Sequence, residues 1–256
     1  MKVKILGAHN CETREYRHTC LVVDDVLALD AGSLTASLSM DEQKALQAVL
    51  LTHQHYDHIR DVIALGTNLF HSGLRTDIFT TSCVSEILET HFFSSGIYRN
   101  LAAVPDQNPT LGMNIIEPGV SFSVDGYDIE AVPVKHSAYT VGYKVSGEDG
   151  GQIFYTSDTG PGLSGCWERV SPKLLNIEVT ESNRSTETMR NVGHLTPALL
   201  EEELVSFQKI RGYVPDIVTV HMSPDREYEI VKELIDVSHR MRCSIIPGFE
   251  GMEIAL

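Results

Sequence analysis

The stretch "LLTHQHYDHIRD", residues 50–61, constrains this chain more than any other, because it places three histidines and an aspartate within six positions after an apolar run. Imidazole nitrogens and carboxylate oxygens are ligands of borderline divalent metals. Side chains at positions i and i+2 of an extended segment share one face, so His53 and His55 can converge on one metal. Asp57 and His58 follow where the chain turns into a helix, and they would face a neighbouring point. The spacing therefore predicts metal binding, with room for two metals.

Helix capping is the alternative explanation for this stretch. Short polar side chains such as Ser, Thr and Asp are common at helix N-termini because they accept hydrogen bonds from free backbone N–H groups. Three histidines within six residues have no such role, and a charged histidine is unfavourable at the positive end of a helix. Metal binding therefore explains the stretch better than capping does.

Three further candidate ligands follow apolar runs later in the chain. His136 lies in "VPVKHSAY", Asp158 in "IFYTSDTGPG" and His221 in "IVTVHMSP". Taken singly, each residue is more typical of a satisfied core or loop group. Because all three recur at the carboxyl ends of predicted strands, we expect them to complete the metal site together with the first cluster.

The composition narrows the class of protein. A formal net charge of -15 over 256 residues repels polyanions, and the sequence has no strong basic patch to overcome this field. No stretch approaches the roughly 20 apolar residues that a membrane-spanning helix needs, and the first apolar run is too short for a secretory signal. The five cysteines show no CxxC spacing, so we expect no disulfide framework and no thiolate zinc site. A reduced, cytoplasmic protein without a membrane partner fits best.

Short β-rich runs alternate with helical patterns, as in α/β proteins. Asp125-Gly126, between two alternating runs, predicts a tight hairpin. Residues 101–114 read as a surface loop that could form one wall of a pocket. With no linker and no repeat visible, we expect a single domain over residues 1–256. The expected helices are Asp41–Ala48, Asp57–Gly66, Ser82–Phe93, Pro197–Ile210 and Arg226–Arg240.

These pieces, in their order, resemble the metallo-β-lactamase superfamily. The resemblance runs through "KILGA", "LALDAG", "LLTHQHYDH", "VKHSAYTVGYKV", "YTSDTGPG", "IEVTESN", "GHLTPALL" and "VTVHMSP", which cover most of the chain. It implies an αββα sandwich, in which two mixed β-sheets flanked by helices carry a metal site at one edge.

The resemblance also implies a dinuclear site. The implied ligands are His53, His55 and His136 for one metal, Asp57, His58 and His221 for the second, and Asp158 as the bridging carboxylate. An anionic bridge offsets the mutual repulsion of two neighbouring cations, and a hydroxide between them would act as the nucleophile. Zinc and manganese both suit these ligands, and iron is also compatible with them.

Three positions refine the resemblance. His55 stands where diiron oxygen and nitric oxide reductases of the superfamily have Glu, which favours hydrolysis over redox chemistry. Asp158 stands where zinc-dependent β-lactamases commonly have Cys, which argues against antibiotic hydrolysis. Asp61 replaces the glycine that usually follows three residues after the motif, and this departure bears on the local turn geometry.

The segments "LLNIEVTESN" and "GHLTPALLEEEL" are similar to the ribonuclease Z and small phosphodiesterase group. His194 would then reach the scissile phosphate as a proton donor or charge stabiliser; the alternative is a solvated residue before a helix N-cap. Asp57 and His194 are the candidate catalytic residues. We expect core packing for Trp167 and Tyr139, with base stacking as the alternative.

The substrate expected from this branch is a small phosphodiester. Transfer-RNA processing members carry a long arm between the ligands that match His136 and Asp158, and here these residues are only 22 positions apart. Long nucleic acid is therefore an unlikely partner, and a cyclic nucleotide or related diester, cleaved by metal-bound hydroxide, is the better candidate.

Two other functions remain open. Thioester hydrolysis of the glyoxalase II kind shares the seven ligands but does not require His194. A structural metal site or a nucleotide sensor would bind metal without turnover, although structural sites usually close their coordination with protein groups. A homodimer fits the general symmetry habit of soluble proteins, without an interface motif to support it.

Overall fold

Two seven-stranded sheets form the centre of the computed structural model, which describes residues 1–94, 96, 98–148 and 150–256. The first sheet has the order β14 (Glu253–Ala255), β1 (Lys2–Gly7), β2 (Cys20–Val23), β3 (Leu27–Leu29), β4 (Ala48–Leu50), β5 (Thr76–Thr80) and β6 (Leu111–Ile115). The second has the order β13 (Ile245–Pro247), β12 (Asp216–Val220), β11 (Leu174–Glu178), β10 (Gln152–Tyr155), β9 (Val141–Ser146), β8 (Tyr127–Pro133) and β7 (Ser121–Val124).

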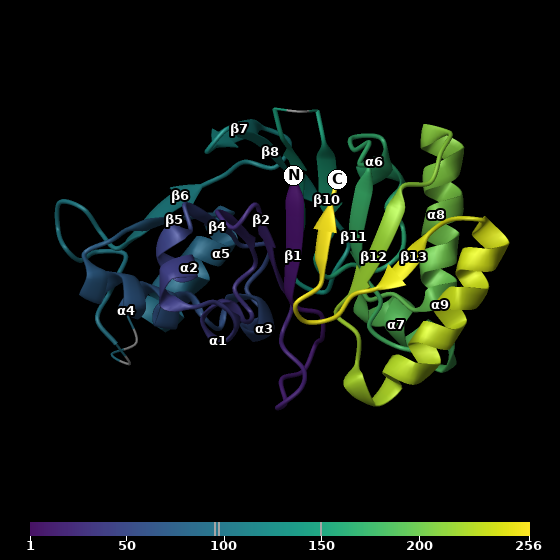
Figure 1. Cartoon of the computed structure of the whole chain (residues 1–256), viewed down its shortest axis with the longest axis horizontal. Coiled ribbons are helices and arrows are strands. Elements are labelled where there is room, and N and C mark those ends of the chain that lie inside the picture. The colour runs from purple at the N-terminus through teal and green to yellow at the C-terminus, as the bar shows by residue number, and fades with distance from the viewer. Residues whose placement is uncertain (95, 97, 149) are drawn as a thin grey trace.

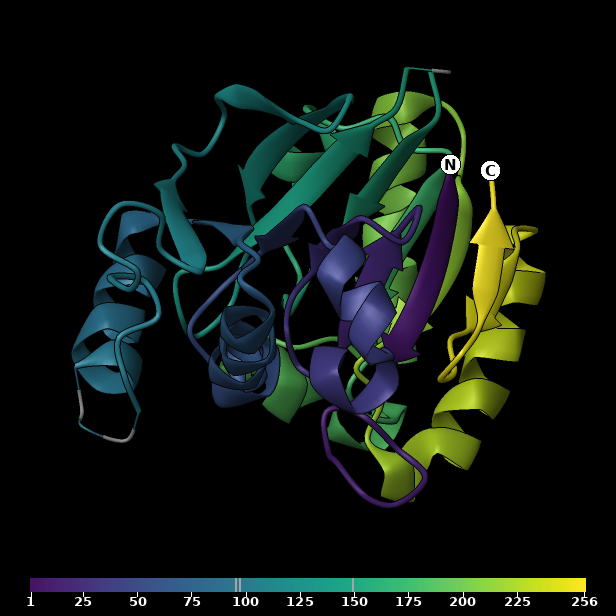
Figure 2. The ribbon, with the colours of Figure 1, turned by 60° about the vertical axis from the view of Figure 1, so that its left-hand side comes forward.

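Both sheets are mixed. In the first sheet, β14 to β3 pair antiparallel and β3 to β6 pair parallel. In the second sheet, β13 to β10 pair parallel and β10 to β7 pair antiparallel. Because β1 pairs with β14, the two ends of the described chain lie side by side (Figures 1 and 2).

Helices cover the outer face of each sheet (Figure 1). Those that follow the first sheet's strands are α1 (Leu34–Ser37), α2 (Met40–Ala45), α3 (Tyr56–Ile59), α4 (Val62–Ser72), α5 (Ser82–Ile87) and the π-helix η1 (Leu88–Phe93). Those that accompany the second sheet are α6 (Ser164–Trp167), η2 (Asn183–Ser185), α7 (Thr186–Val192), α8 (Pro197–Arg211), η3 (Pro224–Arg226) and α9 (Glu227–Met241). The predicted αββα sandwich is therefore confirmed.

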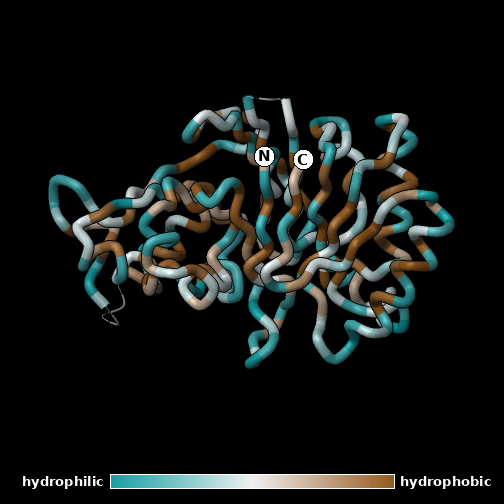
Figure 3. Tube along the Cα trace, in the orientation of Figure 1, coloured by the Kyte–Doolittle hydropathy of each residue, from teal (hydrophilic) through white to brown (hydrophobic). Residues whose placement is uncertain are grey.

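The period-2 pattern of the strands explains the layers. In β3, Leu27 and Leu29 enter the cluster between the two sheets, whereas Ala28 faces the helices on the outer side. In β10, Tyr155 faces the other sheet and Phe154 faces α6 and α8. Both faces of these strands are buried, so they read as continuous apolar runs. Figure 3 shows this hydrophobic colouring along the central strands, with hydrophilic segments concentrated in the outer loops.

Every predicted helix overlaps helical residues of the structure, but three differences appear. One is that α4 continues to Ser72, beyond the predicted end at Gly66. Helix α2 ends at Ala45, because Leu46 adopts an extended backbone and Ala48 begins β4. The segment predicted as one helix from Asp57 is divided into α3 and α4. Its break falls at Asp61, whose amide donates to Ala31 and whose carboxylate accepts from the amide of Thr35 at 2.7 Å. These contacts interrupt the helical hydrogen-bond ladder.

The prediction of a surface loop over residues 101–114 is wrong at both ends. Leu101 is fully buried in the cluster beneath α4, and Leu111 begins β6. The hairpin prediction is confirmed, since Asp125 and Gly126 join β7 to β8 with φ values of 47° and 83°. Within the described part of the chain, none of the helices combines the length and the apolar character needed to cross a bilayer.

Candidate metal centre

The predicted ligands meet at one edge of the sandwich because they follow strands that run in the same direction. His53 and His55 come after β4, and the residues after β8, β10 and β12 are His136, Asp158 and His221. Strands β10 to β12 are parallel, and β8 runs with them because β9 is antiparallel to both β8 and β10. Their carboxyl ends therefore lie at the same edge of the sheet.

One group of side chains consists of His53, His55, His136 and Asp158, whose ligand atoms all lie within 4.8 Å of one another. Nδ1 of His55 is 3.2 Å from Nε2 of His136. Oδ2 of Asp158 lies 3.7 Å from Nε2 of His53 and 3.8 Å from Nε2 of His136. Three imidazoles and one carboxylate oxygen thus surround a single point.

A second group consists of Asp57, His58, Asp158 and His221, again within 4.8 Å of one another. The other oxygen of Asp158, Oδ1, faces this group, at 3.1 Å from Nε2 of His58 and 3.3 Å from Nε2 of His221. Oδ2 of Asp57 lies 3.3 Å from Nε2 of His221. Asp158 therefore directs one oxygen at each group, which is the geometry of a bridging carboxylate.

Hydrogen bonds behind the centre fix the orientation of its imidazoles. Nδ1–H of His58 donates to Oδ2 of Asp30 at 2.7 Å, and Nδ1–H of His136 donates to the carbonyl of Gly193 at 2.9 Å. Such partners set the tautomer and leave Nε2 as the free ligand atom. Both histidines accordingly present Nε2 to the centre.

Threonine hydroxyls hold two of the remaining three imidazoles, those of His53 and His221. Oγ1 of Thr52 lies 3.0 Å from Nδ1 of His53 and donates to Asp30. Oγ1 of Thr180 donates to Glu178 at 2.7 Å, so it accepts at 2.8 Å from Nδ1–H of His221. These two rings also present Nε2 to the centre.

Buried polar atoms test whether a cation fits. Nε2 of His53, Nε2 of His58 and Oδ1 of Asp158 are buried and have no hydrogen-bond partner in the described part of the chain. Leaving such atoms unsatisfied is costly, and a bound cation would satisfy all three. Nitrogen and carboxylate donors also suit borderline divalent metals. The residues present therefore fit a metal centre.

The electrostatics of the first group favour neutral imidazoles. Burial lowers the pKa of His53, His55 and His136, because a charged ring loses its hydration. Metal ligation requires the neutral ring, so these shifts prepare the group for a cation. Burial alone would raise the pKa of Asp158, because it disfavours the charged carboxylate. The neighbouring His221 and His58 nevertheless hold this pKa well below its usual range.

A third cluster adjoins the second group. Nδ1 of His194 donates to Oε1 of Glu178 at 2.6 Å, and the His194 ring lies 4.8 Å from the ring of His136 and stacks on that of His221 at 5.4 Å. Burial opposes the charged form, yet the charge of Glu178 and its hydrogen bond raise the pKa of His194 to about 9. His194 is thus held beside both groups of predicted ligands.

Three residues next to the centre adopt a left-handed backbone that non-glycine residues rarely take. They are Asp30, Ser157 and His221, with φ values of 62°, 56° and 63°. Each follows a strand that ends at the site. Backbone strain of this kind persists where the surrounding contacts fix it, and it is concentrated at functional sites.

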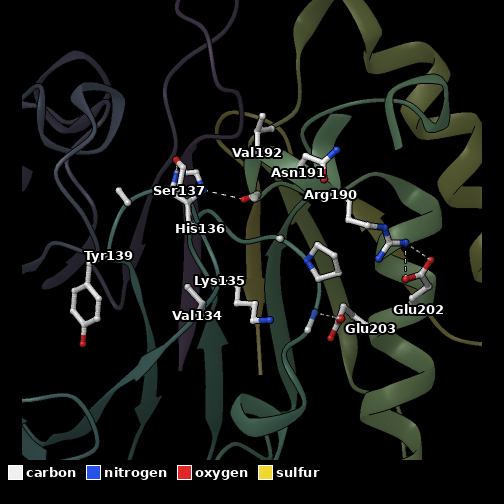
Figure 4. Close-up of a pocket in the computed structure, with 15 residues that line it drawn as sticks. Val134, Lys135, His136, Ser137, Tyr139, Arg190, Asn191, Val192, Glu202 and Glu203 are labelled. Carbon is white, nitrogen blue, oxygen red and sulfur yellow. Dashed lines mark hydrogen bonds and ion pairs between the residues drawn. The ribbon is translucent and has the colours of Figure 1, made fainter. Parts of the chain in front are cut away.

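A cavity of about 960 Å³ opens beside the centre, and His136 lies on its wall (Figure 4). Tyr139 also lines this cavity and is 52% exposed, so the expectation that it packs in the core is wrong. It lies in the connection between β8 and β9, outside the strands. Trp167 is fully buried against Phe154 and Phe207, as expected. The loop over residues 101–114 contributes no residue to this wall among those described.

The model of the "Beta-lactamase superfamily domain" matches residues 23–231. The chain belongs to the metallo-β-lactamase superfamily. This membership supports a metal-dependent hydrolase, and the fold implies divalent metal ions, in agreement with the His/Asp clusters described above. A comparison with curated protein sequences gives no match.

Three solved structures illustrate the shared fold. Unliganded yeast PDE1 superposes with a TM-score of 0.85 at 15% identity, covering 100% of this chain and 99% of that one. A diphosphatase from the PhnP family gives 0.71 at 15% identity, with coverage of 100% and 97%. The short form of human tRNase Z gives 0.68 at 17% identity, with coverage of 100% and 99%.

Within this superfamily, the departure at Asp61 has a structural explanation. Its φ is -86°, which any residue adopts, so the position does not require glycine. Asp61 is 3% exposed. In place of solvent, its carboxylate accepts a hydrogen bond from the amide of Thr35. The aspartate thereby stabilises the junction of α3 and α4 behind the motif.

The sequence motifs contain the residues that orient the histidines of the site, but the sequence alone gave these residues no role. Asp30 contacts His58, Glu178 contacts His194, and Thr180 contacts His221. The available signal was positional, since Asp30 directly follows β3 and Glu178 ends β11 at the same edge of the sheets as the ligands. A polar residue at the carboxyl end of a strand pointed to the site in each case.

Proposed function

We propose that the chain is a dinuclear-metal phosphodiesterase that cleaves a small phosphodiester, with cyclic nucleotides among the candidate substrates. The observation that carries this proposal is the position of His194, held by Glu178 beside the rings of His136 and His221. A group in this place can donate a proton to a leaving oxygen at the edge of the centre. Hydrolysis of an ester with a poor leaving group needs such a residue.

The ligand assignment is part of the proposal. His53, His55 and His136 would hold one cation, Asp57, His58 and His221 the second, and Asp158 would bridge them. When bound, divalent cations supply Lewis-acid stabilisation of the charge that grows on phosphoryl oxygens. Zinc and manganese suit the donor set, and iron is compatible with it.

His194 acts on the leaving group in this proposal. Its Nδ1–H is committed to the Glu178 carboxylate, and its Nε2 has no hydrogen-bond partner among the described residues. Nε2 can therefore carry a proton to the departing alkoxide, while Glu178 stabilises the charged ring. Asp57 is the second candidate catalytic residue, because its side chain is 23% exposed, against 3% for Asp158, and can accept a hydrogen bond from attacking water.

Two observations favour a small substrate. The interval between His136 and Asp158 is occupied by β9, the following turn and β10, so it leaves no length for an RNA-binding arm. The net charge of -15 also opposes a long polyanion. The likeness to yeast PDE1 and to a diphosphatase supports phosphoester chemistry at the level of the fold.

The test is hydrolysis of two diesters by protein loaded with zinc or manganese. Bis(p-nitrophenyl) phosphate has a good leaving group, whereas a cyclic nucleotide must release a ribose alkoxide. We expect turnover of both, and His194→Ala should reduce kcat for the cyclic nucleotide by about 100-fold or more and reduce it less for the nitrophenyl ester. His239→Ala, at an exposed position near the end of α9, is the matched control.

Two outcomes would contradict the proposal. Loaded wild-type protein that hydrolyses neither diester would exclude phosphodiesterase activity of this kind. Undiminished turnover of both diesters by His194→Ala would remove His194 from the mechanism. Hydrolysis of a glutathione thioester in place of the diesters would instead assign the glyoxalase II type of reaction.

A further inference from the structure

The cavity beside the centre has two cationic side chains on its wall. Lys135 precedes His136 in the chain, and Arg190 lies near the end of α7 on the opposite segment (Figure 4). The same wall also carries two carboxylates, those of Glu202 and Glu203. A cation that is not paired with either of them is available to a substrate.

The acidic groups of the same wall are already engaged. Both carboxylate oxygens of Glu202 accept from Nη2 of Arg190, at 2.7 and 2.9 Å. Glu203 is buried and accepts from the amides of Gly162 and Leu163 and from the indole N–H of Trp167. Arg190 therefore has a charged partner, whereas the donors to Glu203 are neutral and do not offset its charge.

Of the two cations on this wall, Lys135 is the one without an ion pair among the described residues. Its ammonium makes no ion pair with any carboxylate of the described residues, and its side chain extends into the cavity in Figure 4. A Cβ added at Gly162 would lie only 2.9 Å from Nζ, and Gly162 has a φ of 103°. The ammonium therefore lies directly against the backbone of Gly162.

The backbone of Lys135 is fixed relative to the centre. Its carbonyl accepts from the amide of Gly160 at 2.5 Å, and its amide donates to Oγ1 of Thr159 at 3.3 Å. Thr159 directly follows Asp158, and His136 directly follows Lys135. Lys135 is thus anchored at its backbone next to two predicted ligands, and its flexible side chain carries the ammonium into the adjoining cavity.

We propose that Lys135 binds a second phosphate group, carried by the part of the substrate that is not cleaved. The inference rests on the proposed function and narrows it to small phosphodiesters that also bear a phosphate monoester. Such a group carries about -1.5 to -2 charges at neutral pH, and an ammonium that makes no ion pair is a suitable point charge for it. A cyclic nucleotide without a further phosphate would leave this contact unused.

Two chromogenic esters test the contact through activity. They are thymidine 5′-(p-nitrophenyl phosphate) and the same ester with a 3′-phosphate, which differ only in the second phosphate. For metal-loaded wild type, kcat/KM should be about tenfold or more higher for the doubly phosphorylated ester. Lys135→Met keeps the aliphatic stem and should abolish this ratio. Lys173→Met removes the same charge from an exposed site outside the cavity and should preserve it.

Calorimetry tests the contact independently of turnover. Thymidine 3′,5′-diphosphate should bind to loaded wild type about tenfold or more tightly than thymidine 5′-monophosphate, and Lys135→Met should lose this difference. If the wild type hydrolyses neither ester, the proposed function fails and the affinity ratio alone decides the role of Lys135. Equal ratios in wild type and Lys135→Met would overturn the inference even if both proteins hydrolyse both esters.

Discussion

Oε1 of Glu178 lies 2.6 Å from Nδ1 of His194, although 16 residues separate them in the chain. Glu178 is fully buried at the end of β11, and its second oxygen accepts from the amide of Leu195 and the hydroxyl of Thr180. The carboxylate therefore joins a strand end to the loop before α8 and orients the ring that lies beside those of His136 and His221. Glu178 acts through His194 and is a positioning residue.

Glu178→Gln keeps the size of the side chain and removes its charge. The amide oxygen can still accept from Nδ1–H, but it no longer stabilises a charged ring, so proton donation from Nε2 should weaken. We expect kcat to fall by about 10- to 100-fold for a cyclic nucleotide, with a smaller fall for bis(p-nitrophenyl) phosphate and little change in KM. Steady-state kinetics with both substrates measures this difference.

A structural role alone would reduce turnover of both substrates equally. Glu168→Gln, at an exposed position after α6, provides the control for loss of one carboxylate. Equal losses on the two substrates in Glu178→Gln would contradict the assignment of Glu178 as the residue that orients a proton donor.

The bridging position of Asp158 predicts a change in metal content. Its two oxygens face different groups of ligands, so Asp158→Ala should weaken both groups and reduce the bound metal from about two ions to at most about one per chain. Asp158→Asn provides a nearly isosteric second variant. Elemental analysis after gel filtration measures the ratio, and Asp236→Ala, exposed on α9, is the control. Two tightly bound ions and full activity in Asp158→Ala would refute the bridge.

The ligand cluster could be predicted because it depends on local patterns. His53 and His55 alternate along an extended segment, and His136 and His221 each follow an apolar run. Strands that run in the same direction then bring their carboxyl ends, and the ligands that follow them, to one edge of the sheet. The αββα order of the layers, by contrast, was implied by the resemblance to the metallo-β-lactamase superfamily, because apolar runs alone do not fix how strands are arranged in sheets.

The contacts behind the ligands depend on tertiary structure. Asp30 lies 28 residues from His58 in the chain, and an aspartate before Ala-Gly is also typical of an ordinary turn. Tyr139 was expected in the core from its residue type, but it lies in a connection that faces the cavity. The break at Asp61 likewise follows from its contacts with Ala31 and with Thr35 of α1, which a helical pattern does not reveal.

An ion cluster far from the ligands predicts acid sensitivity. Burial alone would raise the pKa of Glu130, but hydrogen bonds from Lys144 and Arg169 outweigh it and lower the pKa. Because the folded pKa lies below the unfolded value of about 4.3, the stabilisation is fully present above that value and is lost as pH falls through the folded pKa.

Glu130→Gln tests this cluster. At pH 7 the variant should lose about 1 to 3 kcal/mol of unfolding free energy, since Lys144 is left without its charged partner. At pH 3 the difference from wild type should shrink. Urea denaturation at both pH values, on metal-free samples of each protein, measures the two differences. A difference that is the same at both pH values would rule out the carboxylate as its source.

Gly193 and Gly212 offer a matched pair for separating strain from steric conflict. Both have positive φ, 83° and 79°, at the ends of α7 and α8. A Cβ at Gly193 would lie 3.0 Å from Cα of His136, whose Nδ1–H donates to the Gly193 carbonyl, whereas a Cβ at Gly212 meets nothing within 4 Å. Alanine at either position should cost about 1 kcal/mol of stability through backbone strain.

Only Gly193→Ala should also displace His136 and weaken metal binding, by about tenfold or more. Thermal unfolding and metal titration of the two variants, side by side, measure these effects, and equal metal affinity in both would show that the carbonyl of Gly193 does not position the ligand.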